Sequence, residues 1–229
     1  MELDEAETAS IAGGSRSREA GGRVADVPPP RDPAEAWERA VADQFRNLTA
    51  FAKERDCFLT RADLPSLDYG KGGMEHEIFH DPHEDRFWKS TFAGYAGFGP
   101  SGYSTPFGYL RRLRLSNLVF GDDVRFEGIW ERPDGLSIVT SQRYILPDPM
   151  EGVPTMEAVC EFMTGLGFTR DGENVSFLRE EDGVLAQDAH PRNYIRAVDG
   201  DVYAVDVQPF LERGREWGEV KAFGDVVPD

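Results

Sequence analysis

The hydrophobic pattern changes near Leu64, and this change constrains the fold more than any other feature of the sequence. Before it, Asp32-Pro33 predicts the start of a helix, because aspartate is a favoured N-cap and proline suits the first helical position. After it, short extended segments are interrupted by two predicted helices, at Thr105–Phe120 and from Thr155 onward. A proline-rich link, Leu146–Pro154, divides them. The order predicts an α+β fold in which this link is a hinge between two lobes.

The first 30 residues differ in composition from the rest of the chain. They are rich in Ala, Gly, Ser, Arg and Glu and end in three prolines. Few apolar side chains are available there to offset the entropy lost on ordering, so we expect a disordered tail. The expected parts are therefore the tail at 1–30, an N-terminal helix within 31–63, a β-rich lobe at 64–145 and a smaller lobe at 146–229.

The net charge of -17 bears on the possible partners. Nucleic-acid binding needs a basic surface, so we expect no nucleic-acid partner, although Arg111, Arg112 and Arg114 leave a local basic patch open. No apolar run approaches the roughly 18 residues of a membrane span, and the acidic N-terminus is unlike a secretory leader. Cys57 and Cys160 match no metal or redox spacing, which favours free thiols. A cytoplasmic protein without a membrane partner is expected.

Three polar residues near the C-terminus have an informative spacing. Asp188 lies five residues before Asn193, and Asp206 lies thirteen residues after it, beyond a predicted hairpin that turns at Val198–Asp201. Phosphoryl transfer needs a carboxylate to orient the attacking hydroxyl and oxygen ligands for the metals that bridge the phosphates. The kinase signature places its catalytic Asp five residues before a metal-binding Asn. A surface turn whose side chains bond local backbone groups is the structural alternative.

A lysine and a glycine cluster add to this pattern. Lys89 lies in an apolar, aromatic strand, where it would hold the α- and β-phosphates or, alternatively, extend from a half-buried strand to water. Gly70, Gly72 and Gly73 would let the backbone approach phosphates closely, although such a cluster also occurs in plain loops.

Seven motifs in this order resemble one family over about two-thirds of the chain. They are Gly72–His76, Trp88–Thr91, Tyr109–Leu113, Asn117–Asp123, Ile138–Gln142, Gly167-Phe168 and the block from Asp188 to Asp206. The chain resembles the kinase-like domain found in polyvalent proteins of phages and conjugative elements, which is distantly similar to aminoglycoside phosphotransferases. The run from Asp188 to Asn193 is close to the Asp-x-His-Pro-x-Asn loop of those enzymes.

The resemblance implies a bilobal protein-kinase-like fold with a β-rich N-lobe and a short, reduced C-lobe. It implies an ATP- and Mg²⁺-dependent kinase that acts on a hydroxyl of a protein or small molecule. Asp188 would be catalytic, and Asn193 and Asp206 would bind the metal. The hinge that receives adenine would be formed by Ser141, Gln142 and Arg143.

The sequence departs from the kinase pattern in ways that leave a second class open. The Thr105–Phe120 segment contains no glutamate to pair with Lys89, so Glu75 or Glu127 would have to substitute. The usual Phe-Gly does not follow Asp206, and only 23 residues remain after it. A catalytically inactive pseudokinase or nucleotide-binding module is therefore the alternative.

A competing motif runs from His76 to His80. His-Glu-x-x-His on a helix places two zinc ligands one turn apart, with the glutamate as the general base of a metalloprotease. Glycines just upstream and Asp81-Pro82 just downstream leave little room for a helix and favour a strand. A zinc protease is thus the less favoured reading.

Overall fold

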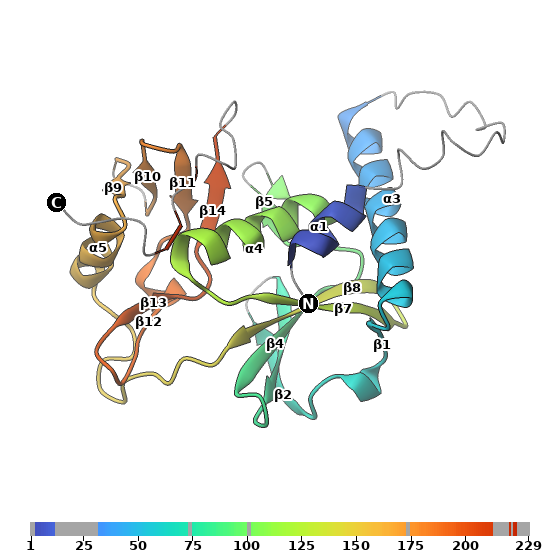
Figure 1. The fold of residues 1–229 in the computed structure, drawn as a ribbon, viewed down its shortest axis with the longest axis horizontal. Coiled ribbons are helices and arrows are strands. Elements are labelled where there is room, and N and C mark those ends of the chain that lie inside the picture. Colours follow the sequence, from blue (N-terminus) through green and yellow to red (C-terminus); the bar gives the residue numbers. More distant parts are fainter. Residues whose placement is uncertain are drawn as a thin grey trace. The chain divides into compact units, whose positions relative to one another are not determined.

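A computed structural model gives the fold of the chain (Figure 1). The structure describes residues 3–11, 32–72, 75–99, 102–172, 175–212, 220 and 222–223. Within these residues, four α-helices and two short 3₁₀ helices combine with several β-sheets, which confirms the predicted α+β class. The chain divides into two compact units. Unit 1 comprises Met1–Arg111 and Arg125–Gln142, and unit 2 comprises Arg112–Val124 and Arg143–Asp229.

Unit 1 is built on a six-stranded sheet of order β1-β7-β8-β4-β3-β2. Its strands are β1 (Phe58–Leu59), β2 (Leu67–Gly72), β3 (His76–Asp81), β4 (Arg86–Thr91), β7 (Arg125–Arg132) and β8 (Gly135–Arg143). The strands β5 (Phe98–Gly99) and β6 (Gly102–Tyr103) form a separate pair. The helical elements are α1 (Leu3–Ile11), α3 (Pro33–Glu54), η1 (Arg61–Asp63) and the first turns of α4 (Pro106–Phe120). The β1–β7 pair is parallel, whereas β2–β3, β3–β4 and β7–β8 are antiparallel.

Helix α3 begins where the sequence predicts. The Asp32 carboxylate accepts a hydrogen bond from the backbone N–H of Glu35 at 2.7 Å, which satisfies one of the orphan donors of the first turn. Phe45, Leu48 and Ala52 recur at helical steps and are buried. This stripe packs α3 against β7 and β1.

Residues 3–11 differ from the expectation of a disordered tail. They form helix α1, which lies beside α3 and also contacts β7 (Figure 1). Leu3 and Ala6 are almost fully buried, and Glu5 accepts a hydrogen bond from Arg55 at 3.5 Å. Leu3 and Ala6 thus obtain from α3 and the sheet the burial that this short helix cannot create alone. The remaining tail residues, 12–31, lie outside the described part of the chain.

The two faces of the large sheet have different neighbours. On one face, Phe79 packs edge-on against Trp130 at 6.2 Å, with Leu64 and Val139 completing a buried cluster. On the other face, the His76 ring contacts helix α4, where Nε2 lies 2.9 Å from the Tyr109 hydroxyl. Side chains alternate across a strand, so the strand register decides which residues can face α4.

Unit 2 consists of the end of α4, helix α5, the 3₁₀ helix η2 and two small sheets. Its strands are β9 (Thr169–Arg170), β10 (Phe177–Arg179), β11 (Val184–Gln187), β12 (Tyr194–Arg196), β13 (Val202–Ala204) and β14 (Gln208–Leu211). One sheet has the order β14-β11-β10-β9, and β12 and β13 form a hairpin. Thr155 caps α5 (Met156–Gly165), as predicted, by accepting a hydrogen bond from the N–H of Ala158 at 3.2 Å. Val159 and Met163 of α5 and Val119 of α4 share the main core with the small sheets.

Candidate active site

Asp188, Asn193 and Asp206 all lie at the ends of short strands in unit 2. Asp188 directly follows β11, and Asp206 lies two residues before β14. These strands are antiparallel partners, with Gln187 opposite Gln208, so the residues just beyond the paired ends approach one another. Asn193 ends η2 (Pro191–Asn193), which leads directly into the β12–β13 hairpin. Two strand pairings therefore bring together residues that are eighteen positions apart in the sequence.

Hydrogen bonds fix the backbone of these three residues. The Asn193 side-chain amide donates to the Asp188 carbonyl oxygen at 2.6 Å. The Asn193 carbonyl accepts from the N–H of Val205 at 2.9 Å and from the N–H of Asp206 at 3.3 Å. Asn193 therefore bonds the backbone of both aspartates. Their positions are fixed by these backbone hydrogen bonds, and their carboxylates take no part in them.

The loop between Asp188 and Asn193 is held by residues to which the sequence analysis assigned no role. The N–H of Ala189 donates to the Val175 carbonyl at 2.9 Å, and the methyl group of Ala189 is buried in the core. His190 Nδ1 accepts from the N–H of Arg192 at 3.3 Å and so caps η2. The His-Pro pair is the sequence signal for this cap, since proline suits the first position of a helix.

The Asp188 backbone adopts φ = 51°, in the left-handed region. Only a small share of non-glycine residues do so, although aspartate tolerates it better than most. Such conformations persist where the surroundings impose them, and they cluster at functional sites. Here the bonds from Asn193 and Ala189 impose it.

The two carboxylates are available to a ligand. Asp188 and Asp206 are exposed, and Asn193 is half-buried. Among the described residues, no side chain donates a hydrogen bond or forms an ion pair with either carboxylate. The described residues contain no group of three or more His, Cys, Asp or Glu side chains placed to hold a metal ion. Two carboxylates and an amide nevertheless fit Mg²⁺, since this ion takes oxygen ligands and usually binds through one or two carboxylates plus substrate phosphates.

Lys89 lies in unit 1, in the middle of β4. It is half-buried and pairs with Ile78 of β3, while Thr91 pairs with His76. Alternation along the strands therefore directs Lys89 to the face on which His76 contacts α4. The phosphate-binding role of Lys89 stays a prediction.

The glycine cluster belongs in part to a strand. Gly70 and Gly72 are in β2, opposite Ile78 and His76, and the register shifts between Asp68 and Gly70. Gly73 lies outside the described residues. A bulge next to glycines is a common feature of strands that approach a ligand, and the role of these glycines in nucleotide binding stays a prediction.

The predicted hinge residues have different surroundings. Ser141 is fully buried at the end of β8, where its hydroxyl accepts from Arg86 Nε at 2.8 Å and donates to Glu127. Gln142 is also buried, whereas Arg143 is exposed and lies over the Tyr203 ring of unit 2 at 5.0 Å. The Ser141 side chain is thus engaged within unit 1, and the contact of these residues with adenine stays a prediction.

The two glutamates considered as partners of Lys89 have contacts of their own. Glu127 accepts the Ser141 hydrogen bond, and Glu75 Oε2 lies 3.9 Å from His76 Nε2. Helix α4 carries no acidic residue. The pairing of Lys89 with either glutamate stays a prediction.

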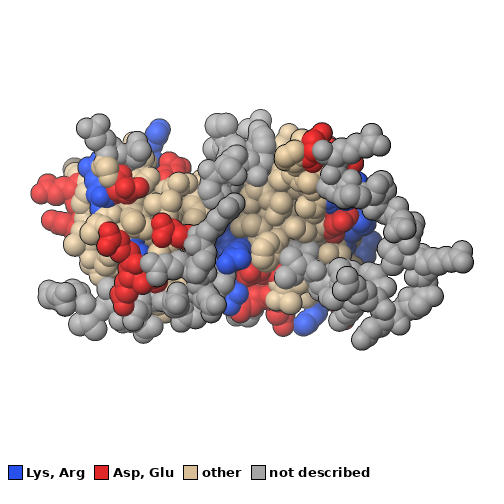
Figure 2. Space-filling model, turned by 90° about the horizontal axis from the view of Figure 1, so that it is seen from above, with Lys and Arg blue, Asp and Glu red and all other residues tan. Residues whose placement is uncertain are grey.

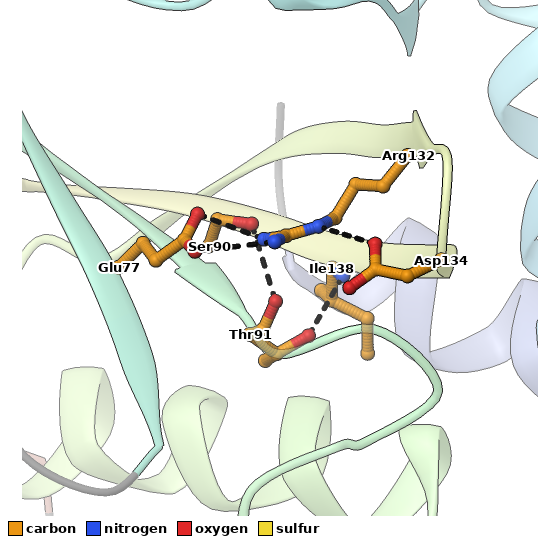
Figure 3. A network of polar contacts seen from close by, with 6 residues as sticks. All are labelled: Glu77, Ser90, Thr91, Arg132, Asp134 and Ile138. Carbon is orange, nitrogen blue, oxygen red and sulfur yellow. Dashed lines mark hydrogen bonds and ion pairs between the residues drawn. The ribbon is translucent and has the colours of Figure 1, made fainter. Parts of the chain in front are cut away.

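The zinc-protease reading does not fit the structure. The His76–His80 segment is in strand β3, where a rise of about 3.3 Å per residue separates the two histidines by roughly 13 Å, too far to share a zinc ion. The would-be general base, Glu77, is instead held by Arg132 through two hydrogen bonds of 2.8 and 3.1 Å (Figure 3). Arg132 also bonds Asp134 at 3.1 Å, so this cluster ties the β7–β8 turn to β3.

Tyr194, immediately after Asn193, is buried and was not singled out by the sequence. Its ring packs edge-on against Phe162 at 5.8 Å, and among the described residues its hydroxyl has no hydrogen-bond partner. Burial raises the pKa of Tyr194 well above its ordinary value, and the nearby Asp122 carboxylate adds to this effect. The Tyr194 side chain therefore packs into the core of unit 2 and fixes the position of the adjacent Asn193.

The surface charges are mixed on the face shown in Figure 2. Acidic side chains occur at several separate places there, with basic side chains between them. No helix in the described ranges has both the length and the apolar character needed to cross a membrane. Cys57 and Cys160 are both free thiols.

The mixed α+β fold is consistent with a kinase-like domain. In a comparison with protein families, residues 42–212 match the model of the "Serine/Threonine/Tyrosine Kinase found in polyvalent proteins". The chain belongs to this family, which confirms the resemblance identified from the sequence motifs. The match begins within α3 and ends one residue after β14, so it includes Lys89 and all three polar residues of the candidate site. No curated protein and no solved structure matches the chain.

Proposed function

We propose that the chain is an ATP- and Mg²⁺-dependent phosphotransferase of bilobal kinase type that acts on a hydroxyl acceptor. The observation that carries the proposal is the convergence of Asp188, Asn193 and Asp206 in unit 2, with both carboxylates exposed and without donors among the described residues. Carboxylates kept free in this way suit a site whose partners are a metal ion and a reacting hydroxyl.

Each residue has a defined role in this proposal. Asp188 would accept a hydrogen bond from the acceptor hydroxyl and orient it toward the γ-phosphate. Asn193 and Asp206 would hold Mg²⁺ through their side-chain oxygens. Lys89 would contact the α- and β-phosphates, with Gly70, Gly72 and Gly73 covering the nucleotide. The Mg²⁺ held by Asn193 and Asp206 would supply positive charge that offsets the negative charge developing on the phosphates.

A second candidate function rests on the composition of α4. This helix contains no acidic residue that could pair with Lys89, whereas kinases use such a pair to assemble the active state. A pseudokinase or nucleotide-binding module would keep the fold and the nucleotide site without turnover. The two candidates differ in whether phosphate is transferred.

Nucleotide binding is tested first by thermal unfolding of the full chain with ATP and Mg²⁺. At a ligand concentration of 100 Kd, binding stabilises the folded state by about 2.7 kcal/mol, which raises the melting temperature by several degrees. We expect Asp206→Ala to abolish this shift. Asp201→Ala is the matched control, because Asp201 is an exposed aspartate in the turn of the β12–β13 hairpin that precedes Asp206, and this variant should keep the full shift. An unshifted wild-type chain, or an Asp206→Ala variant that still responds, would refute the proposed site.

Turnover is tested by incubating the chain with radiolabelled ATP and a cell lysate. Labelled protein would indicate a protein acceptor, and label in small molecules would indicate a metabolite acceptor. Binding without transfer or ATP hydrolysis, unchanged by Asp188→Asn, would select the pseudokinase.

A further inference from the structure

Four large apolar side chains of unit 2 are strongly exposed in two segments that lie side by side. They are Met150 at 89%, Val153 at 62%, Val198 at 56% and Leu146 at 54% of full exposure, and we refer to them as the apolar platform. Single exposed apolar side chains are ordinary, but a group of them marks an interaction site. The proposed kinase chemistry uses none of the four.

Backbone hydrogen bonds hold the two segments of the platform together. The N–H of Val198 donates to the Leu146 carbonyl at 3.2 Å, and the N–H of Arg196 donates to the Gly152 carbonyl at 3.1 Å. Between these bonds, Pro147 and Ala197 form a β-bridge, and the N–H of Asp148 donates to the Arg196 carbonyl at 2.9 Å. The link that the sequence predicts as a hinge is therefore bonded to Arg196 at the end of β12 and to the two residues that follow it.

The loop that carries Met150 is also fixed internally. The Asp148 carboxylate accepts hydrogen bonds from the N–H groups of Met150 and Glu151, both at 2.8 Å. Such an aspartate turn defines the loop backbone. The most exposed apolar side chain of the group is thus presented on an ordered turn, which reduces the entropy lost when a partner binds.

The charged residues around the platform indicate what kind of partner it fits. Glu151 is 75% exposed and lies 3.8 Å from Arg196, while Asp148 and Asp199 add two further carboxylates on the two segments. Arg196 interacts with Glu151 and Asp148, and Arg143 interacts with Asp199, so two arginines face three acids and one negative charge is left in excess. A second copy of this chain, also with a net charge of -17, would bring like charges together, and an anionic lipid surface would do the same.

We propose that the apolar platform docks a protein segment that combines apolar side chains with lysine or arginine. The apolar side chains would cover Met150 and Val198, and the basic ones would pair with Glu151 and Asp199. This docking surface is independent of whether the chain transfers phosphate.

The test uses the full chain and a fluorescent synthetic peptide of about 14 leucine and lysine residues at helical spacing. Binding is followed by anisotropy at physiological salt, with a second peptide in which glutamate replaces every lysine. We expect the lysine peptide to bind and the glutamate peptide to bind at least tenfold more weakly, because complementary charge selects the partner. Equal binding of the two peptides would overturn the charge argument.

The platform itself is tested with Met150→Ser combined with Val198→Ser. Removing two exposed apolar side chains from a contact should weaken binding of the lysine peptide by roughly tenfold or more, without lowering the melting temperature. Tyr95→Ser, which removes an exposed aromatic side chain from unit 1, is the matched control and should bind like the wild type. Hydrogen exchange should show that the peptide protects amides in 146–153 and 196–199.

Three outcomes would overturn the proposal. The double variant could bind the lysine peptide as tightly as the wild type does. Sedimentation could show a wild-type dimer that the double variant makes monomeric, which would assign the platform to a second copy. Vesicles of phosphatidylcholine and phosphatidylglycerol could bind through Met150 and Val198 while the peptide does not, which would assign it to a membrane surface.

Discussion

The two ends of strand β11 carry aspartates that differ in almost every physical respect. Asp182, two residues before the strand, is 0% exposed, and its carboxylate accepts hydrogen bonds from Arg179 Nε at 3.0 and 3.1 Å. Asp188, directly after the strand, is exposed, and no described residue donates to its carboxylate. The carboxylate of Asp182 is thus buried in a structural ion pair, whereas the carboxylate of Asp188 remains exposed and accessible to a ligand.

The difference lies in what surrounds each carboxylate. Arg179 is itself buried, lies over the Phe168 ring at 4.9 Å and donates to the Leu166 carbonyl at 3.2 Å, so the ion pair at Asp182 is fully hydrogen-bonded. A buried charge is tolerated only with such partners. Asp188 is positioned through its backbone, by Asn193 and Ala189. The structural aspartate, Asp182, and the candidate catalytic aspartate, Asp188, are therefore only six residues apart, on either side of strand β11.

The largest expected effect comes from breaking the buried pair. Asp182→Ala should lower the free energy of unfolding by about 3–5 kcal/mol, because it removes the buried carboxylate that pairs with the buried Arg179 guanidinium. Urea unfolding followed by circular dichroism measures the loss. Glu161→Ala, at an exposed position of α5, should change stability by no more than about 0.5 kcal/mol. A loss below about 1 kcal/mol for Asp182→Ala would contradict the structural role.

The matching change at the other end of the strand should have the opposite profile. Asp188→Asn should leave the free energy of unfolding within about 0.5 kcal/mol of the wild type, since asparagine also tolerates the left-handed backbone. If the proposed function is correct, phosphate transfer should fall by about 10²–10⁴-fold while ATP binding persists. A variant that unfolds easily, or one that transfers phosphate normally, would remove the contrast between the two aspartates.

A smaller effect is expected at the half-buried cluster of unit 1. Arg132→Lys should lower the free energy of unfolding by about 1 kcal/mol, because lysine lacks the planar fork that bonds Glu77 and Asp134 together. Burial lowers the pKa of Arg132, but hydrogen bonds to Glu77 and Asp134 outweigh it, so the pKa is raised overall. Arg46→Lys on α3, whose pair with Asp43 is exposed, is the control and should change stability by less than about 0.5 kcal/mol. Equal losses at the two arginines would contradict the assignment.

The smallest effect is expected at Tyr194. Tyr194→Phe should leave stability unchanged or raise it by up to about 1 kcal/mol, because the buried hydroxyl has no partner among the described residues and phenylalanine keeps the packing. The control is Tyr109→Phe, which removes a buried hydroxyl that bonds His76 and should lower stability by about 1 kcal/mol. Thermal unfolding of both variants checks the difference. A clear loss of stability in Tyr194→Phe would mean that the Tyr194 hydroxyl does form a stabilising hydrogen bond.

Much of the fold was predictable because its signals are local. Asp32-Pro33 and Thr155 start helices through their own capping bonds, and Pro133-Asp134-Gly135 turns the β7–β8 hairpin. The spacing of Asp188, Asn193 and Asp206 also belongs to the sequence alone, and with the flanking motifs it led to the kinase family that residues 42–212 match.

Other features depend on residues far apart in the chain, and the sequence does not predict them. Residues 3–11 are too short and too weakly amphipathic to form a stable helix alone, and they obtain their burial from α3 and β7. His76 looks like a metal ligand in the sequence, but a strand and the Tyr109 hydroxyl make it part of the core.

The sequence by itself determined which residues are chemically able to bind phosphate and metal, because residue type and spacing are local properties. Only the tertiary structure decided which acids are free to do so. Solvent access and hydrogen-bond donors at Asp182 and Asp188 come from long-range packing of Arg179 and Phe168 and from the β11–β14 pairing, and these depend on where distant segments meet.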